Sequence, residues 1–193
     1  MSPEKHPFQP FLPPGARILF LGSFPPQPHR WCMPFYYPNW INDFWRIMGL
    51  IFFADKDHFC IVPEKRFDEF AIRTFCADKG LAFYDTATEV RRLRDNASDA
   101  FLEVVTSTDV AALLSQIPSC HTIVTTGQKA TEVIAETFGC DIPPIGGCMQ
   151  LKIPDQVRND EKRAVTFWRM PSTSRAYPLP LERKADAYRR LFL

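Results

Sequence analysis

Ile18-Leu19-Phe20-Leu21-Gly22-Ser23-Phe24-Pro25-Pro26 is the segment that decides the fold of this chain. Its four consecutive apolar residues, 18–21, are typical of a strand that is buried on both faces of a parallel sheet. Gly22 permits a tight exit at the carboxyl end of that strand, where open α/β sheets usually bind their ligands. The segment therefore predicts a central strand that runs directly into a binding loop.

The residues around and after this strand are rich in aromatic rings and poor in charge. Residues 15–50 contain nine aromatic side chains and four charged ones. Prolines at 25, 26 and 38 are expected to stiffen the loops between these rings. So many flat side chains beside a proline-rich loop indicate a pocket for a flat ligand.

Strands and helices alternate along the rest of the chain, and no internal repeat is present. We expect strands at 18–21, 81–85, 121–126 and 164–170, and helices at 40–48, 63–79, 109–116, 128–138 and 181–192. Gly49 and Gly80 are expected to end the first two helices. Residues 140–161 are expected to form an excursion or hairpin with a solvated tip at 155–162. This alternation predicts an α/β fold in which a mostly parallel sheet has helices on both faces.

The carboxyl ends of parallel strands meet at one edge of a sheet, and that edge is where the chemistry is expected. The rule selects the loops at 22–26, 85–88, 125–129 and 171–175. All four are polar or rich in glycine. We therefore expect them to surround one site.

Length and charge restrict the possible partners. The 193 residues suit a single domain, and a formal net charge of +1 predicts no general attraction for polyanions, so any nucleic-acid surface must be local. Residues 169–193 carry six basic and two acidic side chains. This basic segment is either a surface that contacts phosphates or simply a solvated helix face.

Several classes of protein are disfavoured by what the sequence lacks. The first ten residues have no apolar core of signal-peptide length, and no apolar run is long enough to span a membrane, so we expect a cytoplasmic protein. The six cysteines include no CxxC pair, which disfavours metal and iron–sulfur sites. The loop at 22–26 has neither the phosphate-loop pattern nor the dinucleotide fingerprint, which disfavours nucleoside triphosphates and NAD.

The combination of motifs resembles the uracil-DNA glycosylase superfamily and, within it, the hypoxanthine-DNA or mismatch-type branch. The resemblance covers most of the chain and rests on GSFPP at 22–26, YYPNWINDFW at 36–45, YD at 84–85, TGQKA at 126–130 and PSTSRA at 171–176. It implies a single three-layer α/β/α domain over residues 1–193 with a central four-stranded, mostly parallel sheet. It also implies that no metal takes part, and we expect a monomer without a cofactor.

The implied reaction is hydrolysis of the bond between a deaminated base, uracil or hypoxanthine, and deoxyribose in DNA, as the first step of base excision repair. The base must leave the stack, because its glycosidic carbon cannot be reached inside the duplex. Phe24 or Tyr37 would then stack on the base, and Asp85 would read its edge. Backbone N–H groups of Gly22, Ser23 and Phe24 would stabilise the charge on the departing base.

The resemblance also indicates which residues would position the attacking water and which would contact the DNA backbone. Asn42 would position the attacking water, since an amide can orient water without titrating. The hydroxyl loop would contact DNA phosphates, and the residue after it would lie near the minor-groove wedge. This loop consists of Ser172, Thr173, Ser174 and, after the hydroxyls, Arg175.

Departures from the branch leave alternatives open. Asn39-Trp40-Ile41 stands where His-Pro-Arg is usual, so Asn39 is a second candidate for the catalytic amide, and Arg175 replaces a usual proline. Locally, Asn42 could equally be a helix cap, and Asn39 a turn residue. The functional alternatives are a non-catalytic protein that binds nucleic acid or a nucleobase, and a hydrolase that acts on free nucleosides.

Overall fold

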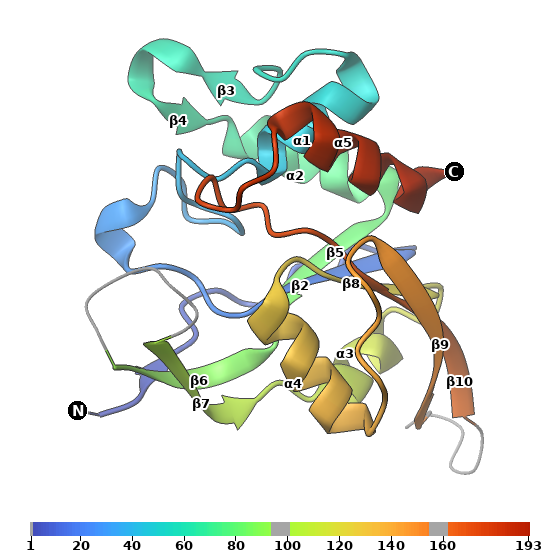
Figure 1. Cartoon of the computed structure of the whole chain (residues 1–193). Helices are drawn as coiled ribbons and strands as arrows, with labels where there is room; N and C mark the ends of the chain where they lie inside the picture. The colour runs from blue at the N-terminus through green and yellow to red at the C-terminus, as the bar shows by residue number, and fades with distance from the viewer. Residues whose placement is uncertain (1, 94–100, 155–161) are drawn as a thin grey trace.

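The computed structural model describes residues 2–93, 101–154 and 162–193, in which a five-stranded sheet lies between helices (Figure 1). The strand order is β5-β2-β8-β10-β9, with β2 Ile18–Gly22, β5 Leu81–Asp85, β8 Thr122–Thr125, β9 Gly147–Pro154 and β10 Lys162–Arg169. Neighbours are parallel except for β9, which is antiparallel to β10. The expected mostly parallel sheet is confirmed, and its parallel part consists of the four strands that the sequence predicts.

The antiparallel strand β9 is an addition to the four-stranded sheet that we expected. It forms the first arm of the hairpin predicted at 140–161. The carboxyl-terminal half of β9 alternates in burial, with Leu151 and Ile153 buried and Lys152 exposed. A strand with one apolar face can close the edge of a sheet, which explains why the hairpin joins it. Residues 155–161, in the predicted tip, lie outside the described part of the chain.

Helices cover both faces of the sheet. On one side lie α1 Phe44–Phe53, α2 Glu69–Lys79 and α5 Leu181–Arg189, and on the other α3 Val110–Gln116 and α4 Gln128–Phe138 (Figure 1). Short 3-10 helices lie between or after the strands and helices, at η1 Pro28–Arg30, η2 Val62–Glu64 and η4 Arg190–Phe192. Among the described residues, no helix is both long and apolar enough to cross a membrane.

Helix α1 differs from the predicted helix at 40–48 at both ends. It begins at Phe44 and runs past Gly49 to Phe53, and Ala54 with φ of 54° follows it. Gly49 is buried against the next loop, because a Cβ there would overlap the backbone oxygen of Asp55. Asp55 N–H in turn donates to the Gly49 oxygen at 3.3 Å. Gly49 therefore does not end the helix. It allows the helix backbone to contact the backbone of the loop that follows.

Helix α2 begins later than the predicted start at residue 63. The carboxylate of Asp68 accepts from the Ala71 N–H at 3.0 Å and caps the helix, which then ends at Gly80 as expected. The preceding residues form a small hairpin of β3 Cys60–Ile61 and β4 Arg66–Phe67. Phe70, in the first turn of the helix, is 82% exposed.

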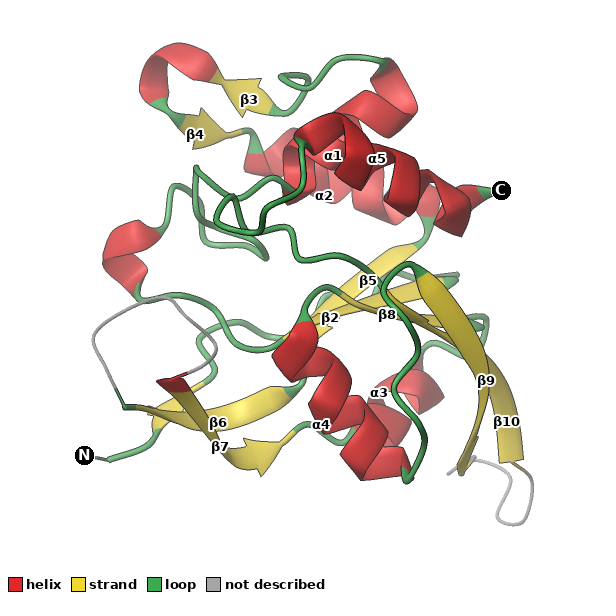
Figure 2. Cartoon of the chain, viewed as in Figure 1, coloured by secondary structure: helices red, strands yellow, loops and turns green. Residues whose placement is uncertain are grey.

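A second small sheet lies beside the central one and contains the amino-terminal segment (Figure 2). Its strand order is β1-β6-β7, with β1 Glu4–Lys5, β6 Ala87–Arg92 and β7 Leu102–Ser107. β6 follows β5 after one residue, so β1 lies close to the carboxyl end of β5. The sequence analysis predicted none of these strands.

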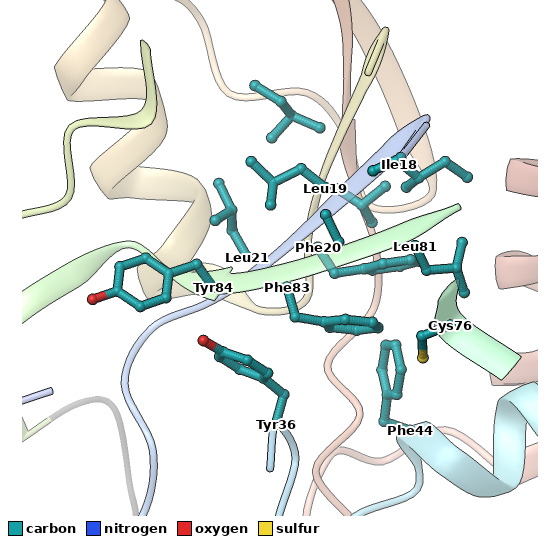
Figure 3. Close-up of a cluster of buried hydrophobic side chains, with 14 of the residues drawn as sticks. Ile18, Leu19, Phe20, Leu21, Tyr36, Phe44, Cys76, Leu81, Phe83 and Tyr84 are labelled. Carbon is teal, nitrogen blue, oxygen red and sulfur yellow. The ribbon is translucent and has the colours of Figure 1, made fainter. Parts of the chain in front are cut away.

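The central strand β2 is buried as its apolar sequence predicts. Residues 18–21 have exposed fractions of 7% or less, and Phe20 stacks on Phe83 of β5 with ring centroids 5.4 Å apart (Figure 3). Phe44, the first residue of α1, meets Phe20 edge to face. This packing anchors the start of α1 against the sheet, and with it the residues just before the helix.

Candidate active site

A cavity of about 620 Å³ lies where the loops after β2, β5, β8 and β10 converge. Its walls include all eleven residues that the sequence analysis proposed for the site: Gly22, Ser23, Phe24, Tyr37, Asn39, Asn42, Asp85, Ser172, Thr173, Ser174 and Arg175. The carboxyl-edge rule therefore located the cavity correctly. The roles proposed for these residues stay predictions.

Asp85 ends β5 and lies directly beside Gly22, the last residue of β2. A Cβ on Gly22 would overlap Asp85 Oδ1, so only glycine allows the carboxylate to occupy this position. Thr86 N–H donates to the Gly22 oxygen at 2.8 Å, and the Thr108 hydroxyl donates to the Asp85 backbone oxygen at 2.7 Å. The backbone around the carboxylate is thus fixed from two sides.

His6 approaches the same carboxylate from the amino-terminal segment. Its Nε2 lies 2.8 Å from Asp85 Oδ2, and its side chain is only 2% exposed. This histidine was not among the site residues proposed from the sequence. Nothing in its local sequence could have revealed the contact, because it depends on pairing between β1 and β6, more than 80 residues apart.

Tyr37 forms part of the cavity wall. The ring stacks on Phe44 with centroids 4.0 Å apart, and the hydroxyl lies 2.7 Å from Thr126 Oγ1. Burial raises the pKa of this phenol above its ordinary value, so it stays neutral. Phe24 also lines the cavity, edge-on to the His6 ring and beneath the Arg92 guanidinium.

The two candidate amides make different local contacts. Asn42 Oδ1 accepts from the Phe44 N–H at 2.9 Å in a turn just before α1, whereas the N-cap position of the helix is occupied by Asp43. Its oxygen keeps a second lone pair, and its amino group supplies two donors. Asn39 Oδ1 accepts from the Ile41 N–H at 3.1 Å, which is the contact expected of a turn residue.

A buried ion pair joins the Asn42 segment to the hydroxyl loop. Lys184 of α5, 1% exposed, donates to Asp43 Oδ2 and to the Ser174 backbone oxygen, each at 2.8 Å. Asp43 N–H donates to the Thr173 oxygen at 2.9 Å, and Arg175 Nη2 lies 3.6 Å from Asp43 Oδ1. The residues 42–43 and 173–175 therefore form one connected unit.

The hydroxyl loop is only partly available to a ligand. Thr173 is buried, whereas Ser174 and the Arg175 side chain are exposed. The oxygens of Ser172 and Ser174 accept from backbone N–H groups two residues ahead, so they also shape the loop. Lys184, counted above in the basic segment, is neither on a solvated face nor at a phosphate-facing surface.

The described residues contain no group of three or more His, Cys, Asp or Glu side chains that could hold a metal ion. The chemically distinctive features of the cavity are instead one buried carboxylate, several rings and two amides. Thr126 and Gly127 bring the amino end of α4 to the same wall. Backbone N–H groups at a helix start favour negative charge nearby.

Comparison with known proteins gives a structural relative. No model of a protein family matches the chain, and no curated protein matches it. Among solved structures, a candidate uracil DNA glycosylase from Methanosarcina acetivorans, determined by solution NMR, matches with a TM-score of 0.60. The match covers 98% of this chain and 99% of that chain at 19% sequence identity. The chain therefore has the fold of that protein over nearly its whole length.

Proposed function

We propose that the protein is a DNA glycosylase that removes uracil or hypoxanthine after the base has been flipped out of DNA. The observation that carries the proposal is the convergence of a buried carboxylate, aromatic rings, an amide and an exposed serine–arginine loop on one cavity. The fold shared with the Methanosarcina protein supports it. Assignment to the hypoxanthine-DNA or mismatch-type branch rests on the sequence motifs.

A flipped base would lie against Tyr37 and Asp85. One face of the Tyr37 ring is covered by Phe44, so the base would use the other face, a stacking contact of about 1–3 kcal/mol. Uracil and hypoxanthine both carry a ring N–H next to a carbonyl. The Asp85 carboxylate can accept from that N–H, and the proposal then requires the glycosidic bond to face Asn42.

Hydrolysis would then proceed with water oriented by Asn42. The water oxygen bonds to C1′ of the sugar, the bond from C1′ to the base nitrogen breaks, and its electron pair leaves with the base. Backbone N–H groups at Gly22 and at the start of α4 would stabilise that negative charge. The proton lost by water balances the proton that the base gains on release.

The exposed part of the hydroxyl loop would hold the DNA. Ser174 and Arg175 stand at the rim, where a phosphate can accept from a hydroxyl, a backbone N–H or a guanidinium. Because the connected unit links this loop to Asn42, contact with phosphate and positioning of the water would depend on the same local structure.

The test is incubation with labelled duplexes that contain deoxyuridine or deoxyinosine, followed by alkali to cleave at abasic sites. We expect cleavage with at least one duplex and a loss of about 100-fold in Asn42→Ala, since a misplaced reactant costs about that much. Asn39→Ala is the matched control for the competing amide. Loss in Asn39→Ala with little change in Asn42→Ala would transfer the catalytic role to Asn39.

A non-catalytic binding protein is the second candidate. It is favoured by two contacts: Asn42 Oδ1 already accepts from the Phe44 N–H, and Arg175 is near Asp43. Tight binding of a lesion duplex without cleavage, equal in wild type and Asn42→Ala, would establish it. Release of base from free deoxyuridine or inosine, unaffected by changes in the hydroxyl loop, would instead indicate a nucleoside hydrolase.

A further inference from the structure

The His6 side chain has a polar role in a place where packing alone would favour an apolar ring. It lies among the rings of Phe24, Tyr36 and Tyr84, with centroid distances of 5.2, 6.3 and 4.6 Å. A phenylalanine could pack against these rings. A phenylalanine has no hydrogen-bond donor, so it would leave the Asp85 carboxylate, in a residue that is 7% exposed, without the partner that His6 provides.

Both nitrogens of the His6 ring have partners that fix its orientation. Nε2 faces Asp85 Oδ2, while Nδ1 lies 3.1 Å from the Phe8 N and 2.9 Å from the Phe8 backbone oxygen. A neutral ring can accept from the Phe8 N–H through Nδ1 and donate to Asp85 through Nε2. A protonated ring can donate to the Phe8 oxygen and still donate to Asp85.

The backbone holds this ring in place independently of its side-chain contacts. His6 N–H donates to the Thr88 oxygen at 2.8 Å, and the preceding residues pair with β6. β6 in turn begins two residues after Asp85, at Ala87. The donor and the carboxylate are therefore carried by the same small piece of sheet, which keeps their separation short.

We infer that His6 is a positioning residue that makes Asp85 a fixed hydrogen-bond acceptor at the cavity wall and thereby selects bases with a ring N–H beside a carbonyl. The inference rests on the proposed function and specifies its substrate class. With Oδ2 held by Nε2–H, the carboxylate accepts with Oδ1, which lies over Gly22 at the wall. Cytosine and adenine present an unprotonated ring nitrogen there, so two acceptors would face each other.

The test compares His6→Phe, which keeps a ring but no donor, with His6→Gln, whose amide can still donate to Asp85. His58→Phe, on an exposed histidine, is the matched control. Under single-turnover conditions with deoxyuridine and deoxyinosine duplexes, we expect His6→Phe to lower base release at least about tenfold, the scale of one lost hydrogen bond to a charged group. We expect His6→Gln to stay within about threefold of wild type, and His58→Phe to match wild type.

Two further measurements separate this role from folding and from the proposed function. Circular dichroism and thermal melting show whether each variant folds, and His6→Phe combined with Asp85→Asn should be no slower than Asp85→Asn alone. Binding of free uracil and hypoxanthine against cytosine and adenine, followed by saturation-transfer NMR, needs no catalysis. We expect wild type to favour the first pair and His6→Phe to lose that preference.

The outcomes distinguish the two proposals. If wild type releases base and a folded His6→Phe does so equally well with the same base preference, the role of His6 is wrong and the glycosylase proposal stands. If wild type releases no base but binds uracil or hypoxanthine in a His6-dependent way, the glycosylase proposal is wrong and the role of His6 in base recognition stands. If it neither releases nor binds any of these bases, both proposals fail.

Discussion

The two sides of the cavity are stabilised by different kinds of contact. On the Asp85 side, a carboxylate meets a histidine among aromatic rings, and the contact stays within β5, β6 and the adjoining amino-terminal segment. On the Asn42 side, the buried Asp43–Lys184 pair joins segments 141 residues apart. Changes on the first side should therefore affect base recognition and the packing around Asp85, whereas changes on the second should affect stability, water positioning and DNA contact together.

Of the changes that test this difference, Lys184→Met should have the largest effect on the free energy of unfolding. It would leave the Asp43 carboxylate buried without its main cation, a change that typically costs about 3–5 kcal/mol of unfolding free energy. Urea unfolding measures it. Arg183→Met, at the exposed neighbouring position, is the control and should stay within about 0.5 kcal/mol of wild type. A cost below 1 kcal/mol for Lys184→Met would mean that the ion pair does not hold the two segments together.

Gly22→Ala should have an intermediate effect, confined to the Asp85 side. The new methyl would overlap Asp85 Oδ1, and relieving such overpacking costs about 1–3 kcal/mol and displaces the carboxylate. We expect slower base release with little change in affinity for undamaged DNA. Adding Gly22→Ala to Asp85→Ala should cost little stability, since the clashing atom is gone. An equal cost in both backgrounds would contradict the close approach.

Arg175→Ala should have the smallest effect on stability and a distinct effect on DNA. Its side chain is 53% exposed, and such a surface pair contributes at most about 1 kcal/mol. If Arg175 contacts a phosphate, the slope of log affinity against log salt should become shallower by about one. Arg189→Ala, exposed on α5, serves as the control. An unchanged slope would mean that Arg175 does not contact a phosphate, and would leave only the serines as DNA contacts on the Asn42 side.

The parts of the fold that were predictable are those that the local sequence determines. Runs of apolar residues identified the four parallel strands, and the carboxyl-edge rule then selected four loops that line one cavity. Tyr37, Asn39 and Asn42 lie outside these loops and were proposed from the family resemblance alone. β1 and His6 were missed because a two-residue strand is specified by its distant partner. Gly49 was misread because the close approach that requires a glycine there comes from tertiary structure.

One signal for Lys184 was present and overlooked. Leu181, Lys184, Ala185 and Tyr188 follow the i, i+3, i+4, i+7 spacing of one helix face, and the last three are buried. A lysine within such a face must either extend to solvent or meet an internal partner. The identity of that partner, Asp43, lies far away in the chain and could not be inferred from the spacing.

The burial of Lys184 also provides a chemical probe of motion at the DNA-facing rim. A reagent that modifies exposed amines, such as an activated ester, cannot reach a side chain that is 1% exposed. Labelling at this position would therefore occur only during openings in which the hydroxyl loop separates from Asp43 and α5. The time course of that single modification, read by mass spectrometry, would report how often the rim opens in solution.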